Sequence, residues 1–239
     1  MDIVPVIDLL GGQVVRARQG QRETYRPIRT PLSATSRPTD VAAGLLRLFP
    51  FRCLYAADID AIERRATNET GIAALTAAAP GIDLWVDNGI ADIEGARAFL
   101  APGDRSLVIG SESQTGTHVL QALRDHPRII LSLDFRGDAF QGPPELLGDT
   151  AFWPDRVIVM TLARVGADAG PDAARVAAIG TRAAGRRIYA AGGVRDAADA
   201  HALAAAGAAG ALVATALHNG ALSPADLSEI AQPRGRAIS

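Results

Sequence analysis

Two aspartates stand at the ends of short apolar runs: Asp8 follows IVPVI, and Asp134 follows RIILSL. Opposed carboxylates suit general acid and general base catalysis on one substrate held between them. Each aspartate alone is better explained as a cap of the loop or helix that follows it, because Asp is a favoured helix N-cap. Their equivalent positions in two halves of a repeat, described below, favour catalysis.

A second group of residues suits the binding of phosphate. Gly192 and Gly193, in YAAGGVRD, leave backbone N–H groups open to the close approach of a phosphate. Ala214 and Thr215, in LVATALHNG, are expected to begin a short helix whose N-terminus completes the site. A glycine pair by itself also serves in a tight turn. Two such segments at neighbouring strand ends favour a phosphate site.

Eight further residues near the ends of the runs are candidates for contact with the substrate. Arg136 and Arg195 would reach an anionic substrate or, equally, extend into solvent. Asp58 would hold a sugar hydroxyl or cap the next helix. Arg16 is interpreted as a structural residue beside the first strand. The eight candidates are Asp58, Asp87, Gly89, Ser111, Arg136, Thr161, Arg164 and Arg195.

These residues would be positioned by eight apolar runs that alternate with segments of helical length. Runs bounded by Gly or Asp and separated by helices indicate a buried parallel sheet, and eight such units predict a single (β/α)8 barrel over residues 1–239. The predicted strands are 3–9, 53–59, 83–89, 106–111, 128–135, 156–162, 187–193 and 210–216. The predicted helices include 41–49, 93–101, 119–126 and 197–207.

The chain also repeats itself in two halves of four units. With one residue anchored at the end of each run, the later intervals are 31 and 21 residues in the first half and 32 and 21 in the second. The repeat predicts two (β/α)4 half-barrels and puts Asp8 opposite Asp134. The first half has about 23 extra residues in the polar segment 19–40, which we interpret as a lid over the C-terminal face. The polar tail 233–239 is expected to be flexible.

Composition excludes several classes of protein. All 24 basic residues are arginine, which excludes enzymes that form a lysine Schiff base and Walker A loops. The net charge of −2 argues against a nucleic-acid partner. One cysteine and four scattered histidines offer neither a disulfide nor a close histidine pair, and we expect no cofactor and no metal. Without a signal peptide or an apolar stretch of about 20 residues, a cytoplasmic protein with no membrane partner is expected.

Several stretches resemble the histidine-biosynthesis (β/α)8 barrels, the HisA/HisF family, over essentially the whole chain: IVPVIDLLGGQVVRARQG, ILSLDFRGD, YAAGGVRD and ALVATALHNG. The closest resemblance is to the ProFAR isomerases (HisA), which convert an aminoaldose to an aminoketose by an Amadori rearrangement without a cofactor. The resemblance implies acid and base roles for Asp8 and Asp134, and a phosphate site on the glycine pair and helix start named above. The sister cyclases rely on a lysine where this chain has Arg16, which counts against a cyclase.

The chain departs from the ProFAR isomerases around that family's second phosphate site. VDNGIAD keeps one glycine, Gly89, of a triple-glycine motif and introduces Asp87, while GSES introduces Glu112 after the fourth strand. A carboxylate repels phosphate unless a proton or cation intervenes. The loop after the sixth strand keeps Arg164 but has Thr161 at an Asp position. We therefore hypothesise that one phosphate site is retained and that the substrate presents a polar or cationic group to Asp87.

Other stretches, including YAADIDAI and LARVGADAGPD, are similar to a HisA/HisF-related group that occurs with one-carbon cofactor genes of the tetrahydromethanopterin and methanofuran type. The sequence thus predicts a HisA-like isomerase of a phosphorylated small metabolite, as a paralogue linked to one-carbon metabolism. Two alternatives stay open: a true ProFAR isomerase, and a non-catalytic barrel that binds a phosphorylated ligand or a partner protein. A monomer or a small homo-oligomer is expected.

Overall fold

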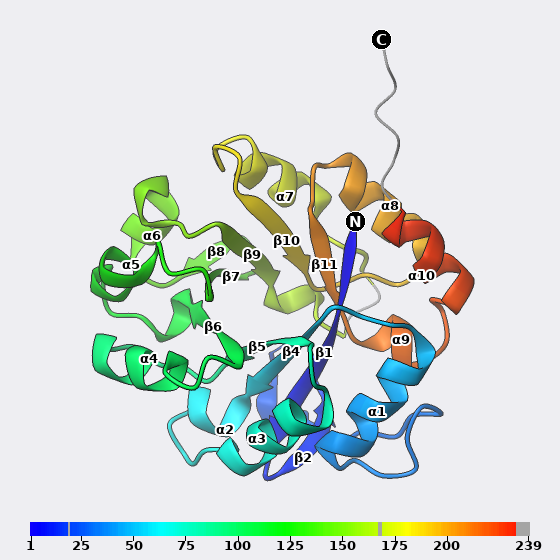
Figure 1. Ribbon diagram of the computed structural model, residues 1–239. Helices are drawn as coiled ribbons and strands as arrows, with labels where there is room; N and C mark the ends of the chain where they lie inside the picture. The colour runs from blue at the N-terminus through cyan, green and yellow to red at the C-terminus, as the bar shows by residue number, and fades with distance from the viewer. Residues whose placement is uncertain (19, 167–168, 233–239) are drawn as a thin grey trace.

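Eight parallel strands close into a barrel in the computed structural model, which describes residues 1–18, 20–166 and 169–232 (Figure 1). The parallel strands follow one another in chain order, and the last pairs with the first. This confirms the predicted (β/α)8 barrel, and each strand overlaps one predicted run. The parallel strands are β1 (Asp2–Leu10), β4 (Cys53–Asp58), β5 (Asp83–Asp87), β6 (Arg105–Gly110), β7 (Ile129–Arg136), β9 (Arg156–Thr161), β10 (Arg187–Ala191) and β11 (Gly210–Val213). Short antiparallel strands extend the sheet: β2 (Gln13–Arg16), β3 (Arg26–Pro27) and β8 (Ala139–Gln141).

Helices cover the outside of the barrel (Figure 1). Polar side chains fix where they begin: Asp92 accepts a hydrogen bond from the backbone N–H of Gly95 at 2.7 Å, and Ser223 and Asp226 form a reciprocal capping box. The helices are α1 (Pro38–Leu48), α2 (Ile59–Ile62), α3 (Glu69–Ala78), α4 (Ile93–Leu100), α5 (His118–Leu123), α6 (Pro144–Gly148), α7 (Ala173–Gly180), α8 (Ala197–Ala205), α9 (Thr215–His218) and α10 (Pro224–Ala231). Among these helices of the described chain, none combines the length and apolar character needed to span a bilayer.

The strands bury both of their faces, against different partners. Outward side chains such as Ile7 pack in a large apolar layer beneath the helices. Inward side chains fill the barrel. Because successive side chains of a strand point to opposite faces, every second residue up to the carboxyl end of the strand also points inward. Two residues after the buried ring of Trp85 comes Asp87, and four residues after Val4 comes Asp8. The same strand therefore supplies an apolar side chain to the barrel interior and a carboxyl to its mouth.

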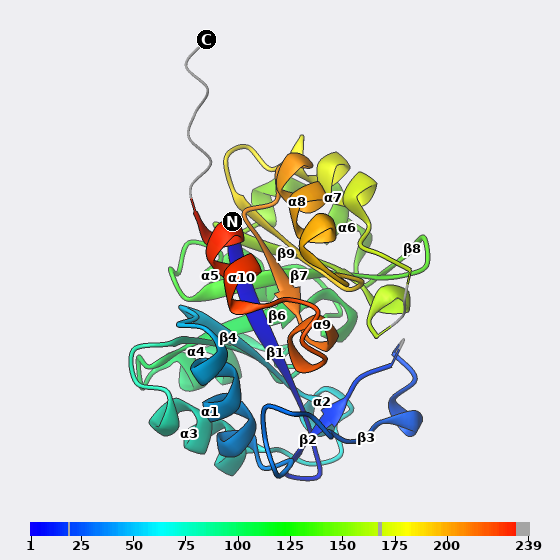
Figure 2. The same cartoon turned by 90° about the vertical axis from the view of Figure 1, so that its right-hand side faces the viewer.

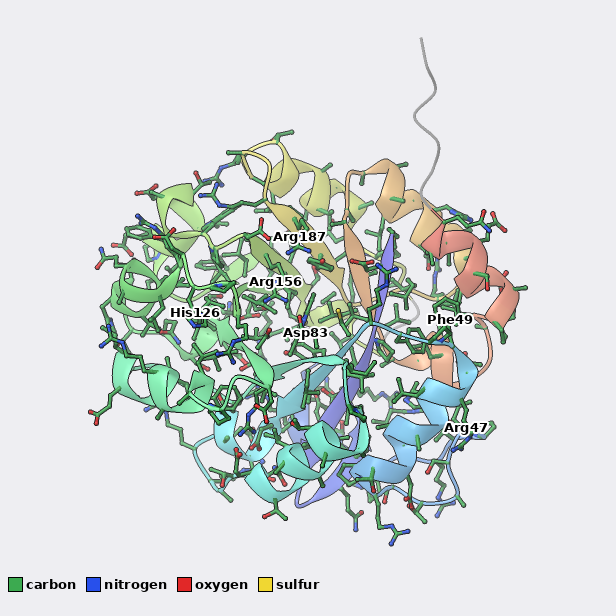
Figure 3. The ribbon with its side chains drawn as sticks, viewed as in Figure 1. Arg47, Phe49, Asp83, His126, Arg156 and Arg187 are labelled. Atoms are coloured by element: carbon green, nitrogen blue, oxygen red, sulfur yellow. The ribbon has the colours of Figure 1, made fainter. Side chains whose placement is uncertain are left out.

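A charged side chain packs inside the barrel at the amino-terminal ends of the strands. The Arg156 guanidinium meets the Asp83 carboxylate at 2.7 Å and lies 5.2 Å from the centre of the Trp85 ring (Figure 3). Asp83 also accepts hydrogen bonds from the Ser106 hydroxyl at 2.7 Å and from the Trp85 indole at 2.8 Å. Tyr189 meets Trp85 edge-on, with 4.9 Å between ring centres. We call this group, which is Asp83, Trp85, Ser106, Arg156 and Tyr189, the floor of the barrel.

Each half of the barrel begins with a strand that turns back on itself. In the first half Asp8 pairs opposite Val15, and in the second half Asp134 pairs opposite Gln141. Both aspartates precede their hairpin partner by the same number of residues, as the internal repeat requires. Figure 2 shows β8, the second strand of one hairpin, and β3, which pairs with the second strand of the other, on the same side of the barrel.

The segment between β2 and α1 is anchored at its far end. The Thr30 hydroxyl lies 3.1 Å from Nδ1 of His218 in α9, a ring whose burial lowers its pKa to about 4. Gly44 of α1 lets the backbone of Leu32 approach so closely that any side chain at 44 would meet that carbonyl. Gln19, the first residue of the predicted lid 19–40, and the tail 233–239 lie outside the described residues.

Candidate active site

A cavity of about 420 Å³ opens among the carboxyl ends of the strands. It receives Asp8 from the first half of the barrel and Asp134 from the second, and it extends to the loops that follow β10 and β11. The structure thus brings the predicted acid–base pair and the predicted phosphate-binding segments to one place. The predicted site residues in its lining are Asp8, Asp87, Asp134, Arg136, Gly192, Gly193, Arg195, Ala214 and Thr215.

Asp134 is held by hydrogen bonds on both carboxylate oxygens. The Ser132 hydroxyl donates to Oδ1 at 2.6 Å, and the backbone N–H of Glu112 donates to Oδ2 at 3.1 Å. Ser111 accepts a hydrogen bond from the Asp134 backbone N–H at 2.9 Å, and its hydroxyl lies 3.2 Å from Oδ2. Burial raises the pKa of Asp134 to about 7, although the hydrogen bond from Ser132 acts in the opposite direction.

Asp8 has a similar proton affinity for a simpler reason. Burial raises its pKa to about 7, and the positive charge of Arg22 lowers it by a smaller amount. With Asp134, the cavity therefore contains two opposed carboxyls that can each hold or release a proton near neutral pH. This is the property required of a general acid and a general base that act in the same medium.

Asp87 is a third carboxyl in the cavity, and it lies beside Asp134. The intervening strand ends in Gly110, where a Cβ would lie 3.1 Å from Oδ2 of Asp87 and 3.5 Å from Oδ2 of Asp134. The Tyr55 hydroxyl and the Gly89 backbone N–H each contact Asp87 at 3.3 Å. Burial and then the charge of Asp134 raise the pKa of Asp87 to about 7. Burial and then the charge of Asp87 raise the pKa of Tyr55 well above its usual value, so this phenol stays a donor.

Arg22 and Glu112 form an ion pair at the edge of the cavity. The guanidinium meets Oε1 of Glu112 at 2.5 Å and lies 3.8 Å from Glu63. Tyr25 lines the cavity from the same segment. Sequence reasoning did not single out Arg22, Tyr25 or Tyr55. The only signal for the first two was their place in the long polar segment between the first two barrel strands.

The loop after β10 has two glycines that no other residue could replace without strain. Gly192 and Gly193 have φ of +100° and +92°. A Cβ on Gly193 would lie 2.3 Å from the carbonyl oxygen of Gly170, and a Cβ on Gly192 would lie 2.7 Å from that of Thr161. The Arg195 guanidinium, also in the cavity lining, pairs with Asp199 at 2.8 Å. A close backbone turn, a helix start and an arginine therefore meet at this end of the cavity.

Five predicted site residues are not among the described residues of the lining, and two of them, Asp58 and Ser111, hold other parts of the structure by hydrogen bonds. Asp58 accepts hydrogen bonds from the backbone N–H groups of Asn68 at 2.7 Å and Ala61 at 3.1 Å. It therefore caps α2, which is one of the two roles that the sequence suggested for it. Ser111 contacts Asp134 through its hydroxyl, as described above.

The other three serve loop geometry. Arg164 donates to the carbonyl oxygens of Ala169 and Gly170 at 3.0 and 2.8 Å. The carbonyl oxygen of Thr161 lies against the turn formed by Gly192 and Gly193, which we call the glycine turn. Gly89 has φ of +69°, packs against the backbone of Ile62, and donates its N–H to Asp87. Among the residues that the structure describes, no group of three or more His, Cys, Asp or Glu side chains is placed to hold a metal ion.

Comparison with known proteins gives a consistent set of relatives. A family model described as "Histidine biosynthesis protein" matches residues 2–223. The chain is 30% identical, over 96% of its length and 95% of the relative's, to the 1-(5-phosphoribosyl)-5-((5-phosphoribosylamino)methylideneamino)imidazole-4-carboxamide isomerase of Symbiobacterium thermophilum. The isomerase of that name from Vesicomyosocius okutanii is 31% identical over 56% of this chain and 54% of its own. An uncharacterised protein of Methanocaldococcus jannaschii is 26% identical over 96% of this chain and 97% of its own.

Proposed function

The chain belongs to the histidine biosynthesis protein family, and from this premise we propose that it is a HisA-type isomerase of a phosphorylated small metabolite, with Asp8 and Asp134 as its acid–base pair. The observation that carries the proposal is the meeting of these two carboxyls, each with a pKa near 7, in one cavity with the glycine turn. Relatives named as isomerases support the reaction class.

An aldose–ketose rearrangement needs protons to be both donated to and removed from one substrate, and a pair of opposed carboxyls can do both. One aspartate, protonated, donates to the ring oxygen of the aminoaldose as the C1–O bond breaks, which gives an open-chain iminium. The other, ionised, removes the proton from C2 to give an enaminol. This carboxyl then returns the proton to C1 while the first carboxyl takes the proton of the C2 hydroxyl, which gives the aminoketone and restores both carboxyls. Atoms and electrons balance within the substrate and the two carboxyls, so no oxidant or reductant is needed.

Binding of the phosphate would fall to the end of the cavity near β10 and β11. Gly192 and Gly193 allow backbone N–H groups to face a ligand closely, and Thr215 begins α9, whose partial positive charge favours an anion. Arg195 lies in the same lining, with its guanidinium held by Asp199. This arrangement supports one phosphate group on the substrate.

We further propose that the chain is a paralogue with one phosphate site, linked to one-carbon cofactor metabolism by its sequence resemblance. The carboxyl of Asp87 supports the loss of the second phosphate site. A second candidate, a true ProFAR isomerase, is favoured by the names of the relatives. The third, a non-catalytic binding barrel, would have no use for two carboxyls poised to exchange protons.

Two assays together test these proposals. Purified protein should fail to turn over ProFAR, and its gene should fail to complement a strain that lacks ProFAR isomerase; success in both would establish the second candidate. In the native host, a disruption of the gene should be rescued by wild type and not by Asp8→Asn or Asp134→Asn. Asp125→Asn, a substitution at a side chain with 94% exposure, is the matched control. Rescue by both cavity variants would refute catalysis and favour a binding protein.

A further inference from the structure

We propose that Asp87 sets the specificity of the cavity: facing Asp134 across Gly110, it admits a monophosphate whose opposite end carries a protonated amine and rejects a second phosphate. The inference rests on the proposed function, since it assumes that the phosphate occupies the glycine turn. It concerns the opposite end of the same cavity, where β5, β6 and β7 end side by side.

The geometry at this end leaves a gap between two carboxyls. Asp87 ends β5 and Asp134 lies near the end of β7, and the strand between them finishes in a residue without a side chain. The Cβ position of Gly110 is 3.1 Å from Oδ2 of Asp87 and 3.5 Å from Oδ2 of Asp134, so these two oxygens of the cavity lining are no more than about 7 Å apart, and a small donor held between them would contact both. An ammonium group has three N–H donors and fits such a gap.

Asp87 is held in place, and turning away from the cavity would break its hydrogen bonds. Its side chain is 8% exposed, and both oxygens have a donor, Tyr55 to Oδ2 and Gly89 to Oδ1. Tyr55 itself is 3% exposed. A ligand therefore meets a preorganised acceptor, whose geometry does not have to form during binding.

The charges around Asp87 oppose a phosphate. Glu112 lies in the same part of the lining, and its charge is met by Arg22 at 2.5 Å, so this arginine is already engaged. A phosphate dianion beside Asp87 and Asp134 would add like charge to a buried pair, which is costly because burial weakens solvent screening. An ammonium would instead neutralise that pair.

The two ends of the cavity therefore differ in the sign of the ligand group that they favour. The glycine turn and Arg195 line one end, and the Asp87–Asp134 pair lines the other. A substrate with a phosphate and an amine matches both ends at once. Reversed placement of the same molecule would bring its phosphate to the carboxyls, so the polarity also fixes the direction of binding.

Calorimetric titration with three probes of equal length tests the inference: aminopentyl phosphate, hydroxypentyl phosphate and pentane bisphosphate. Wild type should bind the amine about tenfold or more tightly than the alcohol, and the bisphosphate most weakly, since one well-placed charge contact is worth about a tenfold change in affinity or more. In Asp87→Asn the preference for the amine should fall to about twofold and the bisphosphate should gain affinity. Asp125→Asn is the control of equal charge change and should behave as wild type.

The outcomes separate this inference from the proposed function. Equal binding of amine and alcohol by wild type, or tightest binding of the bisphosphate, would overturn the inference and leave the phosphate site standing. An unaltered preference in a folded Asp87→Asn protein would overturn the role of Asp87. Failure of all three probes to bind would overturn the proposed phosphate site, and the inference with it. The wild-type comparison decides the matter even where the variant does not fold.

Discussion

Asp87→Asn should change the stability of the fold by an amount that depends on pH. An ordinary aspartate has a pKa of 3.8, and burial with the charge of Asp134 raises that of Asp87 to about 7. Between these values the unfolded chain releases the proton while the folded chain keeps it. The folded state therefore binds more protons, so wild-type stability falls as pH rises from about 4 to about 7 and is constant beyond that window. The asparagine variant lacks this dependence at position 87.

The size of the effect follows from the difference in pKa. About three pH units at 1.36 kcal/mol each give about 4 kcal/mol as the upper bound, and little of this is lost to solvent screening because Asp87 is only 8% exposed. The amide can replace only one of two acceptor oxygens, so a loss of about 1 kcal/mol, independent of pH, is expected from one missing hydrogen bond. Relative to wild type, the variant should be slightly less stable near pH 4 and more stable by up to about 3 kcal/mol near pH 8.

Urea unfolding measured at several pH values between 4 and 8 would show this crossing. Trp85 and Trp153 are buried, so their fluorescence reports the transition. The unfolding free energy of Asp87→Asn, plotted against pH, should diverge from that of wild type, whereas Asp125→Asn should run parallel to it. Parallel curves for Asp87→Asn as well would show that Asp87 is ionised in the folded protein at the same pH as in the unfolded chain, and the reasoning about the carboxyl pair would be refuted.

Two further substitutions test the support of the site. Ser111→Ala removes the acceptor for the Asp134 backbone N–H and a hydroxyl whose hydrogen bond lowers the pKa of Asp134. The unfolding free energy should therefore fall by about 1–3 kcal/mol, and the pH–rate profile should shift to higher pH. An unshifted profile would assign Ser111 to stability alone. Gly193→Ala forces a Cβ to 2.3 Å from the Gly170 carbonyl at φ of +92°, so the unfolding free energy should fall by about 3 kcal/mol or more and the binding of inorganic phosphate should weaken. Gly207→Ala, with φ of +90° in open space, should lower the unfolding free energy by only about 1 kcal/mol. Equal losses in the two variants would contradict the close approach at Gly193.

The sequence allowed the barrel and its acid–base pair to be predicted because both depend on repetition. Apolar runs at regular spacing predict strands, and the repeat frame places Asp8 and Asp134 at equivalent ends. Tyr55 was not predicted, because a strand buried on both faces reads as a continuous apolar run, and its pattern does not say which residues point inward. The hydroxyl of Tyr55 finds its partner on the neighbouring strand, a contact that depends on register.

The remaining differences come from loops. The repeat frame put Gly89 at a strand end, whereas the strand ends at Asp87 and Gly89 lies in the following turn, with positive φ and its backbone against Ile62. Arg22 lies in a segment without periodicity, so only the folded chain shows that it meets Glu112. Position along a strand can be predicted from spacing, whereas the direction of a loop depends on contacts between segments that are far apart in the sequence.

The floor of the barrel has a consequence for how such a protein changes its substrate. On β5, Asp83 belongs to the floor and Asp87 to the mouth, about 13 Å apart at the rise of an extended strand. The first holds Arg156 inside the barrel, so its loss would leave a buried charge unpaired, while the second faces only the ligand and its immediate neighbours. Laboratory evolution could therefore randomise position 87 with Glu112 and keep the same scaffold, provided that Asp83 is left unaltered.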